Sequence, residues 1–453
     1  MRVIILRHGQ STYNSQGRIQ GRSDLSVLTD RGIEDARLTS AAFTGLEFAA
    51  AYASPLQRAQ QTATTVLTGL GQQDRLHTDD RLLEIDLPLW ETMFNQEVRE
   101  KYAHEYQIWK ERPHELTMLL PQADGSQQEF FPVLNLYAQA TAFWQAILPQ
   151  HQGQTILIVA HNGINRALIS TALGIAPRLY HSIQQSNCGI TVLNFSGNWD
   201  DSPEERLCQR VQLESLNQTT HLGQKLPTFR PPNRGPRLLL VRHGETDWNR
   251  AGKFQGQIDV PLNDNGRKQA SLAAEFLKTI PIDFGFTSSM LRPKETAQII
   301  LQAHPDVILQ EDADLREIGH GLWEGKFEAE IKAEYPGELE RWQTHPESVQ
   351  MPEGEHLQDV WDRATGAWQR ILDRVGTHPQ TGIVVAHDAT NKVLLCYLLG
   401  LDLADIWKIK QGNGAVTVID YPDGIEGQPV IQALNLTSHL AGGIFDRTAA
   451  GAL

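Results

Sequence analysis

Cysteine is scarce in this sequence, with 3 residues in a chain of 453. Cys188, Cys208 and Cys396 include no close pair, so neither a disulfide framework nor a thiolate metal site is favoured. We interpret all three as packing residues in a reducing compartment. The chain also lacks an apolar run of the roughly 20 residues that a membrane span needs, and its first apolar run leads into an Arg-His pair instead of a cleavage site. A cytoplasmic protein that does not bind membranes is predicted.

The sequence also has fewer basic than acidic residues. Lysine and arginine number 40 against 54 acidic residues, for a formal net charge of −14. Binding to a nucleic-acid backbone needs the opposite balance, so nucleic acid is excluded as a partner. The 16 histidines lack the helical pairing of a zinc protease. Gly412 and Gly414 lack the third glycine of a dinucleotide-binding turn and predict a simple loop. We therefore predict no metal and no cofactor, and the sequence leaves the oligomeric state open.

The most informative feature that is present is a repeat. Residues 7–14 read RHGQSTYN and residues 242–249 read RHGETDWN, and each octapeptide follows a short apolar run. Such a run, ended by a charged pair and a glycine, is typical of a buried strand where it reaches a ligand-binding crevice. We therefore predict that both histidines lie at the mouths of binding sites.

Further landmarks recur in the same order in both halves. They are an arginine after a serine-containing turn, an acid before Trp-Glu, a Val-Ala-His triplet and a terminal Leu-Asn-x-Thr-x-His-Leu segment. They place Arg58, Glu84, His161 and Asn217 in the first half, and Arg292, Glu317, His387 and Asn435 in the second. The chain is therefore a duplicated domain.

The boundary between the copies is marked by composition. Residues 224–236 contain four prolines and no hydrophobic periodicity, which is typical of a semi-rigid connector. We predict an N-terminal domain over residues 1–223, a linker over residues 224–235 and a C-terminal domain over residues 236–453. Each domain is long enough to bury its own core.

Strand and helix patterns alternate within both copies. Residues 382–386 form an apolar strand that leads into a helix ending near Gly400, and residues 155–160 lead into a helix that closes at Gly174. Thr29 is a candidate helix cap, and a turn at residues 263–266 precedes another helix. The fold class is α/β. His161 and His387 are each predicted at a strand end beside a helix N-terminus, which favours anions.

Two arginines, two histidines and one glutamate from separate segments suit the transfer of a phosphoryl group from a small phosphomonoester. The arginines would neutralise the phosphate dianion, one histidine would attack phosphorus, and the other would donate to the phosphate oxygens. A glutamate kept neutral by burial would protonate the leaving alkoxide and then accept a proton from water.

On these motifs both halves resemble the histidine phosphatase superfamily, the phosphoglycerate mutase-like enzymes. The resemblance implies two tandem three-layer α/β/α domains and a metal-independent phosphoric monoester hydrolase with a phosphohistidine intermediate. It implies nucleophiles at His8 and His243, and pocket amides at Asn14 and Asn249. It further implies phosphate-clamping arginines at Arg7, Arg58, Arg242 and Arg292, second histidines at His161 and His387, and acids at Glu84 and Glu317.

The copies differ around the acid. Glu317 is followed by glycines at positions 319, 321 and 325, whereas the N-terminal copy has Pro88 and Thr92 at the last two positions. Proline and threonine are unsuited to conformations that glycine adopts, so we expect Glu84 to be displaced. The principal site is predicted in the C-terminal copy, and the N-terminal copy is either active, a degenerate scaffold or a ligand-sensing module.

Three further positions bear on substrate and support. His320 resembles a histidine of a metal-independent phosphoserine phosphatase subgroup and would contact a substrate carboxylate, or else be a half-buried loop residue. Asp388 is expected to cap the helix that follows it. The repeated segments at Asn217 and Asn435 either fold back over their own pockets or form surface turns that anchor the last strand.

O-phosphoserine is the first substrate predicted. The alternatives are a sugar or sugar-acid phosphate, a phosphoglycerate mutase reaction, and non-catalytic binding of phosphorylated metabolites or of a partner.

Overall fold

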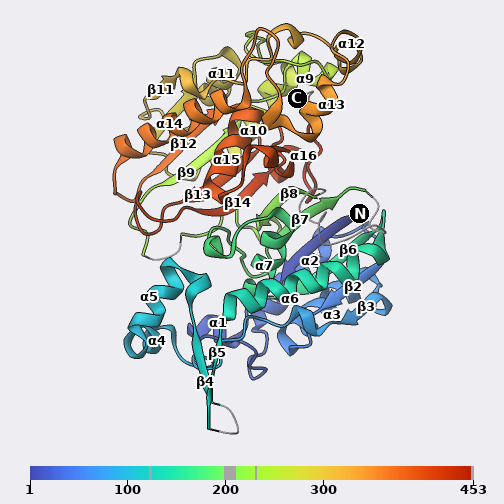
Figure 1. The fold of residues 1–453 in the computed structure, drawn as a ribbon, viewed down its shortest axis with the longest axis vertical. Coiled ribbons are helices and arrows are strands. Elements are labelled where there is room, and N and C mark those ends of the chain that lie inside the picture. Colours follow the sequence, from blue (N-terminus) through green and yellow to red (C-terminus); the bar gives the residue numbers. More distant parts are fainter. Residues whose placement is uncertain (122–124, 198–210, 230–231, 450–453) are drawn as a thin grey trace. The chain divides into compact units, whose positions relative to one another are not determined.

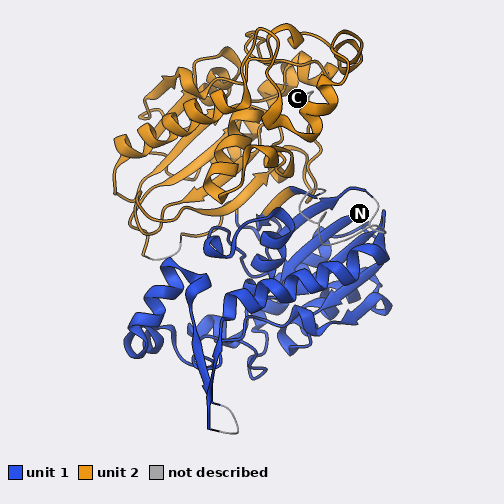
Figure 2. Ribbon diagram, in the orientation of Figure 1, with its two compact units in different colours: residues 1–213, 217–224 blue, residues 214–216, 225–453 orange. Residues whose placement is uncertain are grey.

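The computed structural model describes residues 1–121, 125–197, 211–229 and 232–449. The chain divides into an N-terminal unit, residues 1–213 with 217–224, and a C-terminal unit, residues 214–216 with 225–453 (Figure 2). Residues 230–231 of the predicted linker, and Cys208, lie outside the described residues. Cys188 and Cys396 are buried and unpaired. Within the described ranges, no helix combines the length and the apolar character needed to cross a bilayer.

The N-terminal unit alternates strands with helices. Its strands are β1 (Arg2–Arg7), β2 (Ala50–Ala53), β3 (Leu76–Thr78), β4 (Met118–Pro121), β5 (Gln127–Phe130), β6 (Thr155–Ala160), β7 (Ile190–Phe195) and β8 (Val211–Gln218). Its α-helices are α1 (Thr12–Gln16), α2 (Asp30–Ala42), α3 (Gln57–Leu70), α4 (Asn95–Lys101), α5 (Ala103–Glu111), α6 (Pro132–Ile147) and α7 (Asn162–Leu173).

The main sheet of this unit has the strand order β8-β7-β1-β6-β2-β3. β1, β6, β2 and β3 run parallel, whereas β7 runs antiparallel to β1. Parallel strands joined by right-handed crossovers place α2 and α3 on one face of the sheet and α6 and α7 on the other. α2 packs on α3 and α6 packs on α7, as this arrangement requires (Figure 1).

The C-terminal unit repeats the plan. Its strands are β9 (Arg237–Arg242), β10 (Phe284–Ser288), β11 (Leu309–Asp312), β12 (Thr381–Ala386), β13 (Val416–Asp420) and β14 (Val430–Leu436). Its α-helices are α9 (Asp247–Ala251), α10 (Asp264–Leu277), α11 (Leu291–Leu301), α12 (Glu328–Glu334), α13 (Glu338–Thr344), α14 (Leu357–Val375), α15 (Asp388–Leu399) and α16 (Ser438–Ala441).

The strand order of this unit is β11-β10-β12-β9-β13-β14. β9, β12, β10 and β11 are parallel, and β13 runs antiparallel to both β9 and β14. α10 packs on α11, and α14 packs on α15. The predicted α/β fold in two tandem domains is confirmed.

Local sequence explains the helix ends nearest the sites. The side chains of Thr29 and Asn263 accept hydrogen bonds from backbone N–H groups in the first turns of α2 and α10. α7 and α15 end at Gly174 and Gly400, whose φ angles of 90° and 63° lie in the left-handed region that favours glycine. The predicted cap at Thr29 and the predicted helix ends at Gly174 and Gly400 are confirmed, whereas α10 begins at Asp264, inside the turn predicted over residues 263–266.

Glycines also bring the strand-end loops close to these helices. A Cβ atom added at Gly266, in the first turn of α10, would collide with the backbone carbonyl of Glu245, and one added at Gly32 would collide with that of Gln10. Helix and loop therefore touch through backbone alone. This contact fixes the loop that follows each Arg-His pair.

Candidate active site

Each unit carries an Arg-His pair at the carboxyl end of a central strand. Arg242 is the last residue of β9 and His243 follows it, and Arg7 and His8 stand in the same relation to β1. These side chains are only 2–7% exposed. The apolar strand supplies the burial, because helices cover both faces of the sheet.

A backbone carbonyl fixes the tautomer of the first histidine. Nδ1 of His243 lies 2.7 Å from the carbonyl oxygen of Gly244, and Nδ1 of His8 lies 2.7 Å from that of Gly9. A carbonyl can only accept a hydrogen bond, so Nδ1 carries the proton and Nε2 keeps its lone pair. In the C-terminal unit, Nε of Arg292 donates to Nε2 of His243 at 3.2 Å.

Burial keeps both first histidines neutral. It holds the pKa of His243 well below its ordinary value, with smaller effects from the positive charges of Arg292 and Arg242. Burial lowers the pKa of His8 in the same way, helped by Arg58 and Arg7. A neutral imidazole whose Nε2 carries no proton is the state that a nucleophile requires.

The arginines are anchored by backbone carbonyls. Arg292 donates to the carbonyls of Gly256 at 2.8 Å and Ile258 at 3.3 Å, and Arg242 donates to that of Gln411 at 2.6 Å. Carbonyl oxygens orient a guanidinium without cancelling its charge. The positive charge that these carbonyl anchors leave on each guanidinium can attract a phosphate dianion.

The N-terminal arginines have equivalent anchors. Arg58 donates to the carbonyls of Gly21 and Ser23 at 3.0 and 2.8 Å, and Arg7 donates to that of Gln185 at 2.8 Å. Within the described part of the chain, the buried Nε atoms of Arg7 and Arg58 have no hydrogen-bond partner. These N–H groups are suited to bind an anion.

The second histidines stand where the sequence predicts them. His161 and His387 are the N-cap residues of α7 and α15, directly after β6 and β12. Their ring centroids lie 5.1 Å from His8 and 5.2 Å from His243. Two histidines and a helix N-terminus thus converge on one place in each unit.

A serine hydroxyl orients each second histidine. Nε2 of His387 lies 2.9 Å from Oγ of Ser288, and Nε2 of His161 lies 2.7 Å from Oγ of Ser54. Ser54 and Ser288 belong to the serine-containing turns that precede Arg58 and Arg292. Their recurrence before the clamping arginine is the sequence signal for this role.

The acid of the C-terminal unit binds the start of α15. Oε2 of Glu317 accepts hydrogen bonds from the backbone N–H groups of Asp388 at 3.0 Å and Ala389 at 3.3 Å, and Oε1 accepts one from Thr390 at 3.3 Å. Burial raises the pKa of Glu317, and the negative charge of Asp388 raises it further. A raised pKa favours the protonated carboxyl that a general acid needs.

Glu84 occupies the matching position, so the prediction that it is displaced is wrong. Its carboxylate accepts hydrogen bonds from the backbone N–H groups of Gly163 and Ile164 at the start of α7, both at 3.1 Å. Thr92 adopts a φ of 66°, in the same left-handed region as Gly325 at 82°. This conformation costs a threonine about 1–2 kcal/mol, which the surrounding contacts offset.

An arginine and a glutamine are exchanged between the two acid loops. In the N-terminal unit, Nε of Arg22 donates to the Glu84 carbonyl at 3.3 Å, and Gln139 on α6 donates to the carbonyls of Arg81 and Leu83 at 3.0 and 2.8 Å.

The C-terminal unit uses the opposite pair. Gln257 donates to the Glu317 carbonyl at 3.0 Å, and Arg363 on α14 donates to the carbonyls of Asp314 and Arg316 at 2.8 and 2.6 Å. Both units therefore support the loop of the acid with one guanidinium and one amide at exchanged positions.

Asp388 does not cap α15 through its side chain, contrary to expectation. Its Oδ2 pairs with Nζ of Lys392 at 2.9 Å, and its Oδ1 lies 3.6 Å from Arg242. All three side chains are at least nine-tenths buried. The interactions of the Asp388 carboxylate with two cations are stronger than the single hydrogen bond that it would accept as a helix cap.

The loop at residues 411–414 supports the Arg-His pair, a role that sequence reasoning missed. Nδ2 of Asn413 donates to the His243 carbonyl at 3.1 Å, and the N–H of Gly414 donates to the Arg242 carbonyl at 3.0 Å. Together with the bond from Arg242 to Gln411, these contacts hold the pair from behind. Residues 185–188 repeat the arrangement, since Nδ2 of Asn187 donates to the His8 carbonyl at 2.9 Å.

The repeated segments at Asn217 and Asn435 in turn hold these loops. Oδ1 of Asn435 accepts from the N–H of Gly412, and Oδ1 of Asn217 accepts from the N–H of Ser186, both at 2.7 Å. Both asparagines are buried and have φ angles of 53–54°. Both asparagines are therefore buried supports of these loops, and the turn predicted for each segment is formed by the residues that follow them, Thr220–Leu222 and Ser438–Ala441.

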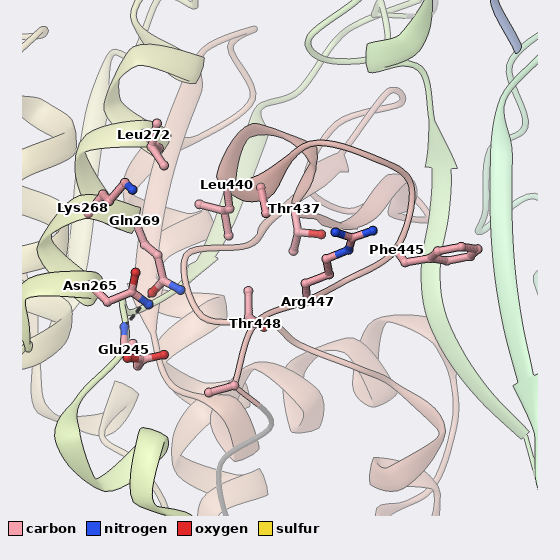
Figure 3. Close-up of a pocket in the computed structure, with 12 residues that line it drawn as sticks. Glu245, Asn265, Lys268, Gln269, Leu272, Thr437, Leu440, Phe445, Arg447 and Thr448 are labelled. Carbon is pink, nitrogen blue, oxygen red and sulfur yellow. Dashed lines mark hydrogen bonds between the residues drawn. The ribbon is translucent and has the colours of Figure 1, made fainter. Parts of the chain in front are cut away.

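A small cavity confirms where the second repeated segment lies. Thr437 and Leu440 face α10 across a cavity of about 180 Å³ that is also lined by Glu245 and Gln269 (Figure 3). Oε1 of Gln269 accepts from the N–H of Glu245 at 2.8 Å. The clamping arginines, the two histidines and Glu317 are not among the residues that line it. The segment therefore packs behind the strand-end loop.

The predicted pocket amides, Asn14 and Asn249, already use their oxygen atoms in hydrogen bonds within the protein. Oδ1 of Asn249 accepts from the N–H of Thr246 at 3.2 Å and from Asn413 at 3.3 Å, and Oδ1 of Asn14 is similarly bonded to Ser11 at 3.2 Å. Because each Oδ1 is engaged, only Nδ2 is left to donate to a ligand.

His320 is fully buried, not half-buried as the alternative held. Its ring packs edge to face against Phe254 and Trp342, with centroids 5.1 and 5.8 Å away. Burial lowers the pKa of His320 to about 3. In the described part of the chain neither ring nitrogen has a hydrogen-bond partner.

Asn435 is expected to control turnover at the C-terminal site. Asn435→Gly retains the left-handed backbone but leaves the N–H of Gly412 unsatisfied, a loss of about 1–3 kcal/mol. We expect kcat/KM to fall about 5- to 150-fold in a His8→Ala background, measured with phosphate release. Asn435→Ala should lose further unfolding free energy in urea, because alanine disfavours a positive φ. Full activity of Asn435→Gly would contradict this role.

Comparison with known proteins agrees with this geometry. The sequence matches the histidine phosphatase superfamily (branch 1) over residues 3–200 and 238–437. It is 30% identical over 447 residues to a protein of Triticum aestivum named 2-carboxy-D-arabinitol-1-phosphatase. This alignment covers 97% of this chain and 86% of the relative. It is 35% identical over 204 residues to Phosphoserine phosphatase 1 of Hydrogenobacter thermophilus. This alignment covers 45% of this chain and 94% of that protein.

Solved structures resemble one half of the chain at a time. Bacillus stearothermophilus YhfR is 30% identical, with a TM-score of 0.43, and the match covers 46% of this chain and 100% of that chain. The family match extends over both halves and includes both Arg-His pairs. The chain therefore belongs to the histidine phosphatase superfamily, and each of its halves contains one region of that family.

Proposed function

We propose that this phosphatase hydrolyses a sugar-acid phosphate through a phosphohistidine intermediate and without a metal ion. The observation that carries the proposal is the Nε2 lone pair of His243, held beside the guanidinium of Arg292 in a buried site. The Triticum aestivum relative aligns with nearly the whole chain, and its name supports a sugar-acid phosphate as the substrate class.

The proposed reaction has two steps. First, Nε2 of His243 forms a bond to phosphorus while the ester P–O bond breaks, and Glu317 gives its proton to the departing alkoxide. Water then attacks the phosphohistidine, its proton passes to the Glu317 carboxylate, and the P–N bond breaks. Inorganic phosphate leaves, and both side chains return to their starting states.

Phosphoserine is the second candidate substrate. The similarity to Phosphoserine phosphatase 1 favours it. The setting of His320 weakens it, because the ring that would read the substrate carboxylate is neutral and enclosed by Phe254 and Trp342. We therefore rank a sugar-acid phosphate first.

The two nucleophiles can be separated by substitution. We expect His8→Ala to retain the larger share of phosphate release, His243→Ala to retain the smaller share, and the double variant to be inactive. Phosphate release and isomerisation should be measured with 2-carboxyarabinitol 1-phosphate, O-phosphoserine and 3-phosphoglycerate. The intermediate should be an acid-labile phosphoprotein. Isomerisation without phosphate release would identify a mutase. If neither reaction is observed, the chain would be a non-catalytic binding protein.

Glu317 should act as the proton donor. Glu317→Gln keeps size and hydrogen bonding but carries no transferable proton, so alkoxide esters should slow by about 10²–10⁴-fold. An aryl phosphate, whose leaving group needs little protonation, should slow much less. Because the pKa of Glu317 is raised, the parent should lose activity as pH rises through that pKa, and this limb should vanish in the variant. Equal slowing of both esters would assign Glu317 to phosphate positioning.

Activity should survive thorough chelation. The positive charge that a phosphoryl group needs is supplied by Arg242, Arg292 and the N-terminus of α15. We expect kcat/KM to be unchanged after dialysis against EDTA, with the metal content of the sample measured in parallel. A loss of rate that magnesium or manganese restores would contradict this mechanism.

A further inference from the structure

The two sites differ on the helix that follows the second histidine. Asn162 and Arg166 on α7 correspond to Asp388 and Lys392 on α15, at the same distances from His161 and His387. A neutral residue and an arginine therefore replace an acid and a lysine. The difference lies on the helix whose first turn binds the acid, Glu84 in one unit and Glu317 in the other.

In the C-terminal unit the cation of this pair is already neutralised. Nζ of Lys392 lies 2.9 Å from Oδ2 of Asp388, and the other oxygen of Asp388 lies 3.6 Å from Arg242. Asp388 thus places a fixed negative charge beside the phosphate-clamping arginine. A second acidic group on a substrate would be repelled there.

In the N-terminal unit the corresponding cation faces neutral groups. Arg166 is 7% exposed, and its NH1 and NH2 atoms lie 3.1 Å from Nδ1 of His181 and 3.0 Å from Oε1 of Gln184. Burial lowers the pKa of His181 to about 3, so this histidine is uncharged. Nε of Arg166 is buried without a partner in the described part of the chain.

Arg166 also lies beside the reacting groups. Its guanidinium is 5.6 Å from the centroid of the Tyr180 ring. A Cβ atom added at Gly163 would collide with the Tyr180 hydroxyl and the Glu84 carboxylate, so both pack on this glycine. The charge of Arg166 helps to lower the pKa of Arg7. Tyr180 therefore connects Arg166 to the groups around Gly163, and the charge of Glu84 acts on Arg166.

A buried guanidinium without a carboxylate partner is costly unless an anion neutralises it. Glu84, the acid whose charge acts on Arg166, is engaged by the N-terminus of α7. A planar guanidinium with a free N–H group is suited to a carboxylate. A ligand carboxylate would supply the hydrogen-bond partner that the buried Nε of Arg166 lacks in the described part of the chain.

We propose that Arg166 forms a subsite in the N-terminal domain for a carboxylate on the leaving group of the substrate, and that the Asp388–Lys392 pair closes this subsite in the C-terminal domain. The inference rests on the proposed phosphatase function and concerns the selectivity of each site, not its share of the total activity. The N-terminal site prefers acidic phosphate esters over uncharged ones more strongly than the C-terminal site does.

The test uses two esters that differ in one group. 3-Phosphoglycerate has a carboxylate where glycerol 1-phosphate has a hydroxymethyl group. Selectivity is the ratio of their kcat/KM values, measured with the N-terminal site alone in His243→Ala and with the C-terminal site alone in His8→Ala. We expect the selectivity for 3-phosphoglycerate to be about tenfold or more higher in His243→Ala, the factor for about 1.4 kcal/mol.

Substitution of Arg166 should remove this selectivity. In the His243→Ala background, Arg166→Gln should lower the ratio about 10- to 150-fold, as expected for a lost charge-assisted hydrogen bond, mainly through the KM for 3-phosphoglycerate. Arg166→Lys should preserve part of it. A merely structural role would lower both kcat/KM values equally. Equal losses, or an unchanged ratio, would overturn the proposal.

The reciprocal variant provides a matched control in the other domain. In the His8→Ala background, Asp388→Asn frees Lys392 and should raise the selectivity for 3-phosphoglycerate. An unchanged or lower ratio would count against the proposal, even if Arg166→Gln failed to fold.

Binding distinguishes this inference from the proposed function. If His243→Ala has no turnover, calorimetric titration with 3-phosphoglycerate should show a binding step that weakens in His243→Ala/Arg166→Gln, and an unchanged step would overturn the subsite. If the unmodified chain releases phosphate from no ester, the phosphatase proposal fails, whereas this titration still decides the subsite.

Discussion

Both sites depend on the hydrogen bond that the first histidine donates from Nδ1 to the carbonyl of the following glycine. The bond keeps the proton away from Nε2, which faces the clamping arginine. It exists because the chain turns back directly after the strand. The loop can turn there because Gly266 lets helix α10 touch the backbone of Glu245. The close backbone contact that Gly266 allows thus helps to determine which ring nitrogen of His243 carries the proton.

The second constraint is the burial of several like charges in a small volume. Arg242 and Arg292 are almost completely buried, yet their anchors are the carbonyl oxygens of Gln411, Gly256 and Ile258. Carbonyl dipoles partly replace the lost hydration, and at Arg242 the carboxylate of Asp388, 3.6 Å away, adds an ion pair. The cost of concentrating the charge is thereby reduced, while the electrostatic attraction for a dianion is retained. The loops that carry these carbonyl groups supply no reacting side chain, but they hold the arginines that bind the phosphate.

Much of the fold and the set of reacting residues could be predicted from sequence. The alternating patterns predicted the α/β fold, and the recurrence of four motifs in one order predicted that His243, Arg292, Glu317 and His387 converge. The structure brings these residues together in the C-terminal unit, and their counterparts together in the N-terminal unit. Both sets follow strand ends or helix starts, where local sequence largely decides position.

The remaining features depend on contacts that sequence patterns do not encode. Glu84 was expected to be displaced because Thr92 replaces a glycine, but hydrogen bonds from α7 hold the carboxylate and outweigh the local strain. The loop at residues 411–414 contributes mainly backbone groups, which leave no signature in the side chains. Asn435 was noticed because it is repeated, yet its partner Gly412 is distant in sequence. Long-range backbone contacts are what motif spacing misses.

The exchange of Arg22 and Gln139 for Gln257 and Arg363 limits how the two halves can evolve. Transferring one position from either half to the other would place two guanidinium groups, or none, around the loop of the acid. Only the paired change preserves one of each. A substitution that copies only one of these positions from one half to the other would therefore change the charge around the acid loop by one unit and alter the contacts that hold Glu84 or Glu317.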